Sequence, residues 1–272
     1  MKIALLGGSH AGKLGLVDTT GGTVSVLSED MTLARLADGE TPLPVAEIPV
    51  QDASLAAPLM PGARVLCVGL NFYDHAKEAG MAVPELPSIF PRFRSSFSAP
   101  DEAIIAPSIS AQFDYEVELT VVIGRAGRHI AEADAAKHIL GYTCLADNSV
   151  RDWQKHSRQA TPGKNFDRSG AIGPWISTTD EMPPLAEIAL ETFVNGVRRQ
   201  HGSGGDLIFS PDYCVSYISN FMELRPGDMI ALGTPAGVAS GEAEPNWLKP
   251  GDQVELRISG IGSLRNAVQA EQ

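Results

Sequence analysis

The sequence predicts a mainly β fold with some helix, of the α+β class. Short strand candidates separated by glycine-containing turns recur along the chain. Two Pro-Gly-Asp turns, at residues 226–228 and 250–252, each precede an apolar or alternating strand. The regular alternation of strands and helices that a doubly wound parallel sheet requires is missing. With 272 residues, the chain can form one large domain or a main domain with a small companion.

Residues 1–62 are expected to form a small β-rich domain. Three short strand candidates are separated by glycine turns, and they cover residues 2–7, 14–18 and 23–27. Residues 30–38 have the apolar spacing of a short amphipathic helix. Residues 42–62 are rich in proline, so we expect an extended linker there.

Residues 7–13 spell the G-x-x-x-x-G-K pattern of a phosphate-binding loop, but their context argues against that function. Such a loop needs Ser or Thr after the lysine, and a helix that aims backbone amides at phosphate. Here Leu14 follows Lys13, and the next residues predict a strand and a turn. A glycine-rich hairpin accounts for the same letters, so we expect no phosphate site in this segment.

Residues 63–272 are assigned to a second, larger domain. Helices are predicted at residues 73–80, 130–142 and 211–224, and glycines at 80 and 141 are the expected stop signals of the first two. Strands are predicted at residues 64–70, 113–124 and 143–150, and after each Pro-Gly-Asp turn. The Asn195-Gly196 pair predicts the tight turn of a hairpin within residues 185–200.

The composition argues against two kinds of partner and predicts a location. Acidic residues outnumber basic ones by 33 to 21, so we expect no nucleic-acid or anionic-membrane surface. No apolar segment approaches the roughly 20 residues that span a bilayer, and the N-terminal apolar run is too short for a signal peptide. We therefore expect a cytoplasmic protein. The three cysteines form no C-x-x-C pair and are interpreted as small buried hydrophobic side chains.

Three acids alternate along the strand predicted at residues 113–124. Side chains at positions i and i+2 of a strand share one face and lie about 6.6 Å apart, so Asp114, Glu116 and Glu118 are expected on the same face. Carboxylates placed in this way repel one another unless something positive lies between them. A solvated edge face is one interpretation of this row.

A metal site is the other interpretation of the acidic row. Asp147 directly follows an apolar strand candidate, and together with Glu116 and Glu118 it would supply three carboxylates. Hard divalent cations such as Mg²⁺, Mn²⁺ and Ca²⁺ take oxygen ligands of this kind. Zinc is less favoured, because no His and Cys cluster has the spacing of zinc ligands.

Residues 63–268 resemble the fumarylacetoacetate hydrolase family, in its bacterial lid-bearing members. The resemblance is carried by the segments VGLNFYDHAKEAG, DYEVELTVVIGRAGR, GYTCLADNSVRDWQ, TPGKNFDRSGAIGPW, VNGVRRQ, LRPGDMIALGTPAGV and LKPGDQVELRISGIGSLRN. It implies a mixed β-sandwich roll for a catalytic domain of residues 63–272, usually assembled as a homodimer. It further implies that Glu116, Glu118 and Asp147 bind Mg²⁺ or Mn²⁺, with Ca²⁺ possible in a crystal, and that Asp114 makes a structural contact.

The resemblance also implies catalytic residues. His75 and Glu78 match a pair on a mobile lid, and the carboxylate would orient the imidazole so that it can draw a proton from water. Lys164 matches the family lysine near the metal, where it would hold a substrate carboxylate or an enolate oxygen. Gln154 matches a substrate-contacting amide.

Further residues are implied to contact the substrate or to support the site. Tyr73, close to the lid, and Thr234 are implied to line the substrate site. Arg92 stands where the family often has Lys, which keeps the charge and favours bidentate carboxylate binding. Arg151 and Asp152 are expected to form a structural ion pair.

The leading functional prediction is a divalent-metal-dependent hydrolase in the catabolism of aromatic or related compounds. It would cleave a C–C bond in a 1,3-diketo or 2-oxo acid, such as an acylpyruvate or fumarylpyruvate, through an enolate. The first alternative is an isomerase, decarboxylase or tautomerase of 2-oxo-dienoate or oxaloacetate-like acids, because the fold does not fix the reaction. The second is a non-catalytic metal- or ligand-binding protein of the same fold.

Overall fold

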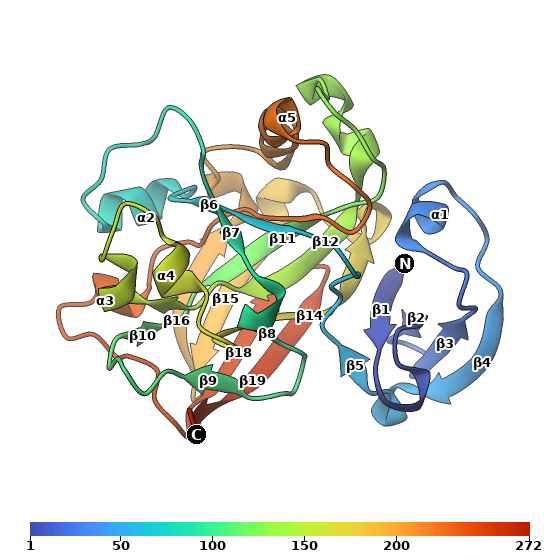
Figure 1. Cartoon of the computed structure of the whole chain (residues 1–272), viewed down its shortest axis with the longest axis horizontal. Coiled ribbons are helices and arrows are strands. Elements are labelled where there is room, and N and C mark those ends of the chain that lie inside the picture. Colours follow the sequence, from blue (N-terminus) through green and yellow to red (C-terminus); the bar gives the residue numbers. More distant parts are fainter.

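A computed structural model describes residues 1–272, and two β-sheets form its framework (Figure 1). The larger sheet has the strand order β4-β3-β2-β1-β14-β12-β11-β17-β6-β7, with β5 paired to β1 and β8 paired to β14. Its strands are β1 (Lys2–Leu6), β2 (Leu14–Asp18), β3 (Thr23–Leu27), β4 (Pro44–Pro49), β5 (Leu55–Ala56), β6 (Val65–Gly69), β7 (Ser88–Arg92), β8 (Phe97–Ser98), β11 (Val117–Ile123), β12 (Ile139–Ala146), β14 (Gly170–Thr178) and β17 (Met229–Ala231).

The smaller sheet has five strands in the order β16-β15-β18-β19-β9. They are β9 (Ile104–Ala106), β15 (Ala189–Val194), β16 (Val197–Ser203), β18 (Gln253–Ile258) and β19 (Gly262–Ala270). A separate short pair joins β10 (Phe113–Asp114) to β13 (Ser149–Val150). The mainly β fold with two packed sheets is therefore confirmed.

The helices are short and lie outside the sheets (Figure 1). The α-helices are α1 (Leu33–Ala37), α2 (Tyr73–Glu78), α3 (Arg151–Gln154), α4 (Thr161–Lys164) and α5 (Pro211–Phe221). The 3₁₀ segments are Gly8–His10, Val50–Asp52, Arg94–Ser96, Glu132–His138, Thr179–Glu181, Leu185–Glu187, Gly204–Asp206 and Ala239–Gly241. None of the helices is long and apolar enough to cross a membrane.

Several local predictions are confirmed. Helices α1, α2 and α5 lie within three of the four segments predicted to be helical. The hairpin between β15 and β16 turns at Asn195 and Gly196, whose φ angles of 52° and 77° are those of the turn that this residue pair favours. Residues 8–10 form a single 3₁₀ turn between β1 and β2, so the glycine-rich segment is a hairpin connection.

Two predicted boundaries are wrong. The helix predicted at residues 130–142 is a 3₁₀ segment that ends at His138, because Ile139–Ala146 pairs with two neighbouring strands as β12. A Cβ at Gly141 would lie 2.1 Å from the carbonyl oxygen of Ser177, so this glycine allows close packing of strands instead of ending a helix. The predicted linker contains β4, an edge strand in which proline is tolerated.

Both faces of β11 are buried, which explains its continuous apolar run. Val117, Leu119 and Val121 pack into the core between the two sheets, whereas Val122 packs into a second core with strands β6 and β12. Glu118 shares the Val122 face and is 2% exposed. The interpretation of the acids as a solvated edge face is therefore wrong.

The strand predicted at residues 113–124 is interrupted. Residues 113–114 pair with β13, and β11 begins only at Val117, so Tyr115 and Glu116 lie between two strands. The acids still gather in one region, but they do so across a break in the chain.

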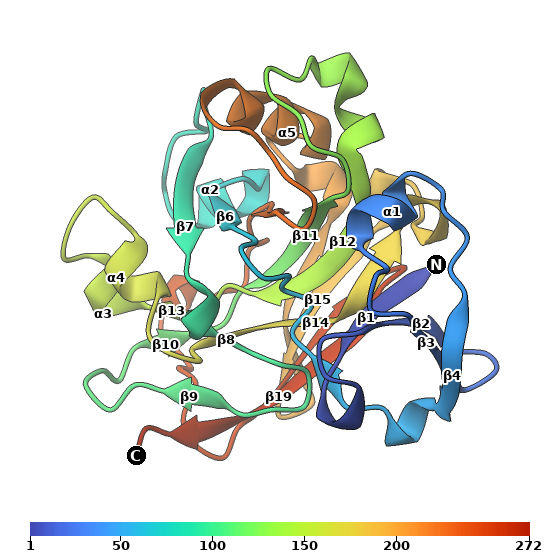
Figure 2. The same cartoon turned by 45° about the vertical axis from the view of Figure 1, so that its right-hand side comes forward.

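The N-terminal strands extend the larger sheet (Figure 2). Strand β1 pairs with β14 through Lys2 with Ser177 and Ile3 with Ile176. Side chains of the first 62 residues, Ile3 and Leu33 among them, share a core with Ile176. The division at residue 62 remains a prediction, with a continuous sheet running across it.

Candidate metal and acid-base site

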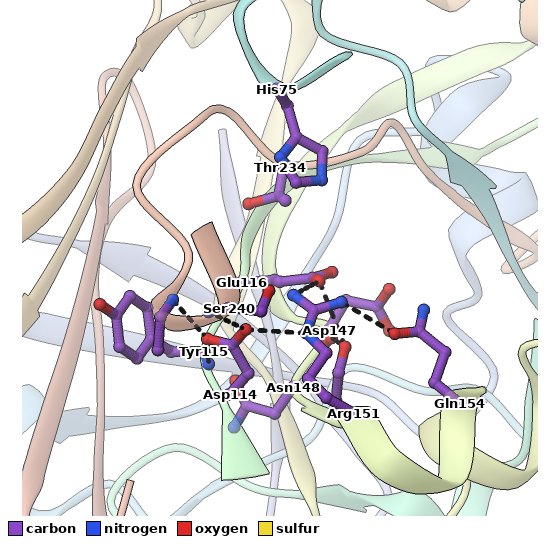
Figure 3. A network of polar contacts seen from close by, with 12 residues as sticks. His75, Asp114, Tyr115, Glu116, Asp147, Asn148, Arg151, Gln154, Thr234 and Ser240 are labelled. Carbon is purple, nitrogen blue, oxygen red and sulfur yellow. Dashed lines mark hydrogen bonds and ion pairs between the residues drawn. The ribbon is translucent and has the colours of Figure 1, made fainter. Parts of the chain in front are cut away.

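Buried charged side chains meet near the start of β11, and Figure 3 shows Asp114, Glu116, Asp147 and Arg151 among them. Four acids and three cations contribute, and each of them is at most 7% exposed. The acids are Asp114, Glu116, Glu118 and Asp147, and the cations are Arg92, Arg151 and Lys164. Their formal sum is −1, because four negative charges face three positive ones. Buried charges are rare unless they are paired, so their concentration here marks a candidate functional site.

Glu116 is held by two cations. Arg151 donates to its Oε1 through Nη2, and the Lys164 ammonium donates to its Oε2 over 2.7 Å. Burial on its own would raise the pKa of Glu116, but Lys164 and Arg151 outweigh burial and lower the pKa to about 2. His75 is close enough to contribute to the same effect. Glu116 is therefore ionised throughout the physiological pH range.

Asp147 is held from two sides. Arg92 donates to its Oδ1 over 2.9 Å, and Lys164 donates to its Oδ2 over 2.6 Å and to its carbonyl oxygen over 2.7 Å. With Glu116, these contacts use all three donors of the Lys164 ammonium. Burial lowers the pKa of Lys164, but Asp147 and Glu116 outweigh it and raise that pKa above its ordinary value. Lys164 thus fixes two of the acids to each other.

Glu118 is the one acid of the four that forms no ion pair. Its Oε2 accepts a hydrogen bond of 2.9 Å from the backbone N–H of Gly233. Burial, followed by the nearby Asp147 carboxylate, raises the pKa of Glu118 well above its ordinary value. A buried carboxylate of this kind needs a proton or an added cation, so the site has the charge deficit that a divalent metal would fill.

Three side chains lie close enough together to bind one metal ion, and the sequence did not suggest one of them, Cys67. Ligand atoms of Cys67, Glu118 and Asp147 all lie within 4.8 Å of one another, and all three residues are buried. Two of them belong to the predicted set of Glu116, Glu118 and Asp147. The carboxylate of Glu116 lies next to this group, attached to Asp147 through Lys164. The ligand role of Glu116 remains a prediction.

Asp114 anchors the surroundings of the site. Arg151 donates to its Oδ2 over 2.7 Å, and the backbone N–H groups of Ala239 and Ser240 donate to its two oxygens (Figure 3). Arg151 therefore pairs with Asp114 and Glu116, and the expected pair between Arg151 and Asp152 is wrong. The Asp152 carboxylate instead accepts from Ser110.

His75 lies above the buried acids (Figure 3), and it forms a pair with Glu78 on the same helix, α2. His75 Nδ1 lies 3.1 Å from Glu78 Oε2, and the two side chains are 15% and 20% exposed. The other oxygen of Glu78 accepts from the N–H of Gly237 over 2.9 Å. The carboxylate can fix the ring orientation through Nδ1, which leaves Nε2 free to exchange a proton.

The remaining predicted site residues differ in whether they contact the buried acids and cations. Gln154 accepts a hydrogen bond of 2.9 Å from Arg151, and Thr234 accepts one of 2.8 Å from Gln200. Arg92 has a fully buried side chain that pairs with Asp147, so it holds this acid in place. Tyr73 is 53% exposed at the start of α2 and makes no hydrogen bond to the charged cluster.

Two candidate site residues, Cys67 and Gln200, were not predicted from the sequence. Cys67 lies on β6, and only the pairing of β6 with β17 brings it near β11. Gln200 is buried, and its amide joins Val117 to Thr234 and Pro235. The run Arg198 to His201 is entirely polar, so no alternation in the sequence indicates that Gln200 faces inward.

Comparison with known proteins identifies the family. Residues 64–269 match the family described as fumarylacetoacetate (FAA) hydrolase C-terminal. The chain belongs to the fumarylacetoacetate hydrolase family. A fumarylacetoacetate hydrolase domain-containing protein 2 homolog of Dictyostelium discoideum is 38% identical over 233 residues, which cover 82% of this chain and 76% of that protein. The mitochondrial oxaloacetate tautomerase FAHD2A of Homo sapiens is 35% identical, over 91% of this chain and 84% of its own.

Solved structures of the fumarylacetoacetate hydrolase family agree with the fold over the whole chain. A 2-hydroxyhepta-2,4-diene-1,7-dioate isomerase from Mycobacterium marinum has a TM-score of 0.84 at 31% identity, covering 100% of this chain and 99% of its own. A fumarylacetoacetate hydrolase from Exiguobacterium antarcticum has a TM-score of 0.87 at 32% identity, with both chains covered fully. Relatives thus include a tautomerase, an isomerase and a hydrolase, all acting on small molecules.

Proposed function

We propose that this protein is a divalent-metal-dependent enzyme that forms the enolate of a 2-oxo acid. The observation that supports this most strongly is the His75–Glu78 pair above a buried acid cluster that lacks one positive charge. A proton-transferring pair and a cation-binding pocket are the two parts that enolate chemistry needs.

The residues of the chain divide the work. His75 takes a proton from the carbon next to the substrate carbonyl, or returns one there, while Glu78 keeps the imidazole oriented. Glu118 and Asp147, with Glu116 beside them, would hold Mg²⁺ or Mn²⁺, which supplies Lewis-acid polarisation of the carbonyl oxygen. Lys164 and Arg92 keep the acids in place. Gln154 remains a proposed substrate contact.

Proton transfer without bond cleavage is the reaction that we place first. The relatives named as an oxaloacetate tautomerase and a dienedioate isomerase catalyse such steps. Both names describe acids that carry two carboxyl groups, so a dicarboxylic 2-oxo acid is the proposed substrate class. A place in the breakdown of aromatic compounds would follow from the isomerase activity.

Hydrolysis of a C–C bond is the second candidate. The His75–Glu78 pair can equally draw a proton from water, which would then attack the distal carbonyl of an acylpyruvate. The same cation site would stabilise the enolate that leaves. A relative named as a fumarylacetoacetate hydrolase supports this second candidate.

Assays on the purified chain with Mg²⁺ or Mn²⁺ distinguish the candidates. Interconversion of the keto and enol forms of oxaloacetate would support the first, and cleavage of an acylpyruvate would support the second. His75→Ala is expected to lower kcat by about 10²- to 10⁴-fold. The control is His201→Ala, which changes an exposed histidine on β16. Equal activity of both variants would contradict the role of His75.

A homodimer in the cytoplasm also belongs to the proposal. Five large apolar side chains are exposed on α2 and the segment that follows it, where a partner subunit could cover them: Tyr73, Met81, Val83, Leu86 and Phe93. Light scattering would show a particle of twice the 28.8 kDa chain mass if the dimer forms. A particle of single chain mass would contradict it.

A further inference from the structure

The missing positive charge of the site belongs next to Glu118, because the other three acids have cationic partners. We call the region around the Glu118 carboxylate the Glu118 corner. Arg92, Arg151 and Lys164 contact the other three acids, and none of them contacts Glu118. Glu118 is 2% exposed, so water does not compensate its charge. A cation that binds here would contact whatever other donors face the same corner.

Strand register places Cys67 in this corner. Cys67 pairs with Ala231 on β17, and Ala231 pairs with Thr120 on β11, so the three residues form one row across the sheet. Glu118 lies two residues before Thr120 and therefore on the same face of β11. Because the middle of the row is an alanine, the Cys67 thiol comes within 4.8 Å of the ligand oxygens of Glu118 and Asp147.

Polar atoms on this face lack partners. The Cys67 thiol is fully buried and makes no hydrogen bond, which is also true of Cys144, whereas the thiol of Cys214 donates to Phe209. The Thr120 hydroxyl, in the same row, is also buried without a hydrogen bond. Buried polar atoms are normally satisfied. Of the two atoms left over here, the Cys67 thiol lies within ligand distance of Glu118 and Asp147.

We propose that Cys67 is a donor to the cation bound by Glu118 and Asp147, so that the site is a mixed sulfur and oxygen site. This inference rests on the proposed function in one respect, that a divalent cation binds in this corner. Sulfur donors favour Zn²⁺ and Co²⁺ over Mg²⁺, which prefers oxygen ligands. The site therefore accepts Mg²⁺ or Mn²⁺ through its carboxylates and holds Zn²⁺ or Co²⁺ more tightly through Cys67.

Cobalt binding to the metal-free full-length protein tests the proposal directly. Co²⁺ bound to a cysteine sulfur gives an intense near-ultraviolet sulfur-to-cobalt absorption band, which oxygen ligands do not give. We expect this band at one equivalent of Co²⁺ in the unmodified protein. Binding of Co²⁺ without the band would overturn the proposal, and this result requires no variant.

A pair of cysteine variants assigns the band. Cys67→Ser should abolish the sulfur-to-cobalt band and weaken Zn²⁺ binding by at least about tenfold. Loss of a residue that only contacts a metal ligand already lowers metal affinity by about 10- to 100-fold. Binding of Mg²⁺ should change little, because Mg²⁺ gains little from sulfur. Cys144→Ser is the matched control, since Cys144 is equally buried but packs in the other core. A band that survives Cys67→Ser would also overturn the proposal.

The outcomes separate this inference from the proposed function. Turnover of a 2-oxo acid with Mg²⁺ or Mn²⁺, without a sulfur-to-cobalt band, would remove Cys67 from the site and leave the enzymatic proposal intact. A band without turnover of oxaloacetate or acylpyruvates would support Cys67 as a donor and contradict the proposed reaction.

Discussion

Arg92 shows how single residues maintain the charge arrangement of the site. Its side chain is fully buried, and its guanidinium donates to Asp147, to the hydroxyls of Ser96 and Ser169, and to nearby carbonyl oxygens. The planar fork of arginine suits such a set of acceptors better than the ammonium of lysine. Arg92 therefore compensates the buried charge of Asp147 even when no substrate is bound.

Removal of Arg92 is predicted to destabilise the protein strongly. Arg92→Ala leaves Asp147 with Lys164 as its only cationic partner, and loss of one member of a buried ion pair costs about 3–5 kcal/mol. Urea unfolding measures the change. Arg198→Ala, which removes an exposed pair with Glu191, should change the unfolding free energy by less than about 1 kcal/mol. Similar losses in both variants would contradict the structural role of Arg92.

Glu118 is predicted to couple metal binding to stability. In metal-free protein at neutral pH, Glu118→Gln should not lower the melting temperature, because it removes a carboxylate that burial and Asp147 disfavour. Added Mn²⁺ should raise the melting temperature of the unmodified protein but not that of the variant, since ligands that bind the folded state stabilise it. Equal stabilisation of both proteins by Mn²⁺ would exclude Glu118 from the metal site.

At the scale of elements, α2 is a short helix held in place by its own acids. Asp74 accepts from the N–H of Ala236 over 3.2 Å, and Glu78 accepts from the N–H of Gly237. The same loop carries Thr234, so the docking of α2 brings His75 over the site. The position of the helix and the orientation of His75 are thus linked through Glu78.

Loss of the Asp74 contact is predicted to loosen α2. Asp74→Ala should increase amide hydrogen exchange in residues 73–79 and 236–237 and reduce kcat/KM by about tenfold, because one hydrogen bond to a charged group contributes about 1.5–3 kcal/mol. Lys77→Ala, on an exposed position of the same helix, should change neither. Faster exchange without loss of activity would show that α2 docking does not limit the reaction.

The smaller sheet carries a pH-sensitive cluster. Arg257, together with Arg265, holds Glu255 and lowers its pKa to about 2 from the ordinary value of 4.5. A lowered folded-state pKa means that the contribution to stability is present above pH 4.5 and is lost as pH falls toward 2. Glu255→Gln should therefore lower the melting temperature at pH 7 and less so at pH 3. The effect is at most about 1 kcal/mol, because solvent screens these surface pairs. An equal deficit at both pH values would contradict this assignment.

At the scale of the whole molecule, short-range signals in the sequence were enough for some features and not for others. The Asn195-Gly196 hairpin and helix α5 depend on local turn chemistry and helical periodicity, and both were predicted correctly. The helix predicted near His138 was wrong because sheet pairing took over residues 139–146. Cys67 was missed for a related reason, since its neighbours come from strands about 50 to 165 residues away in the sequence.

Removal of the N-terminal strands tests whether residues 63–272 form an independent domain. Without residues 1–62, β14 would lose its partner β1, and the core that contains Ile176 would lose Ile3, Leu27 and Leu33. Burying each of these side chains contributes about 1.5–3 kcal/mol, and an exposed apolar strand edge promotes aggregation. A chain of residues 63–272 is therefore predicted to melt at a lower temperature and to self-associate, as calorimetry and gel filtration would show. The matched control is the full-length chain cut at an inserted protease site after residue 62, in which the N-terminal segment stays bound. If residues 63–272 alone keep the melting temperature and Mn²⁺ binding of the full chain, the boundary at residue 62 separates two independent domains in spite of the continuous sheet.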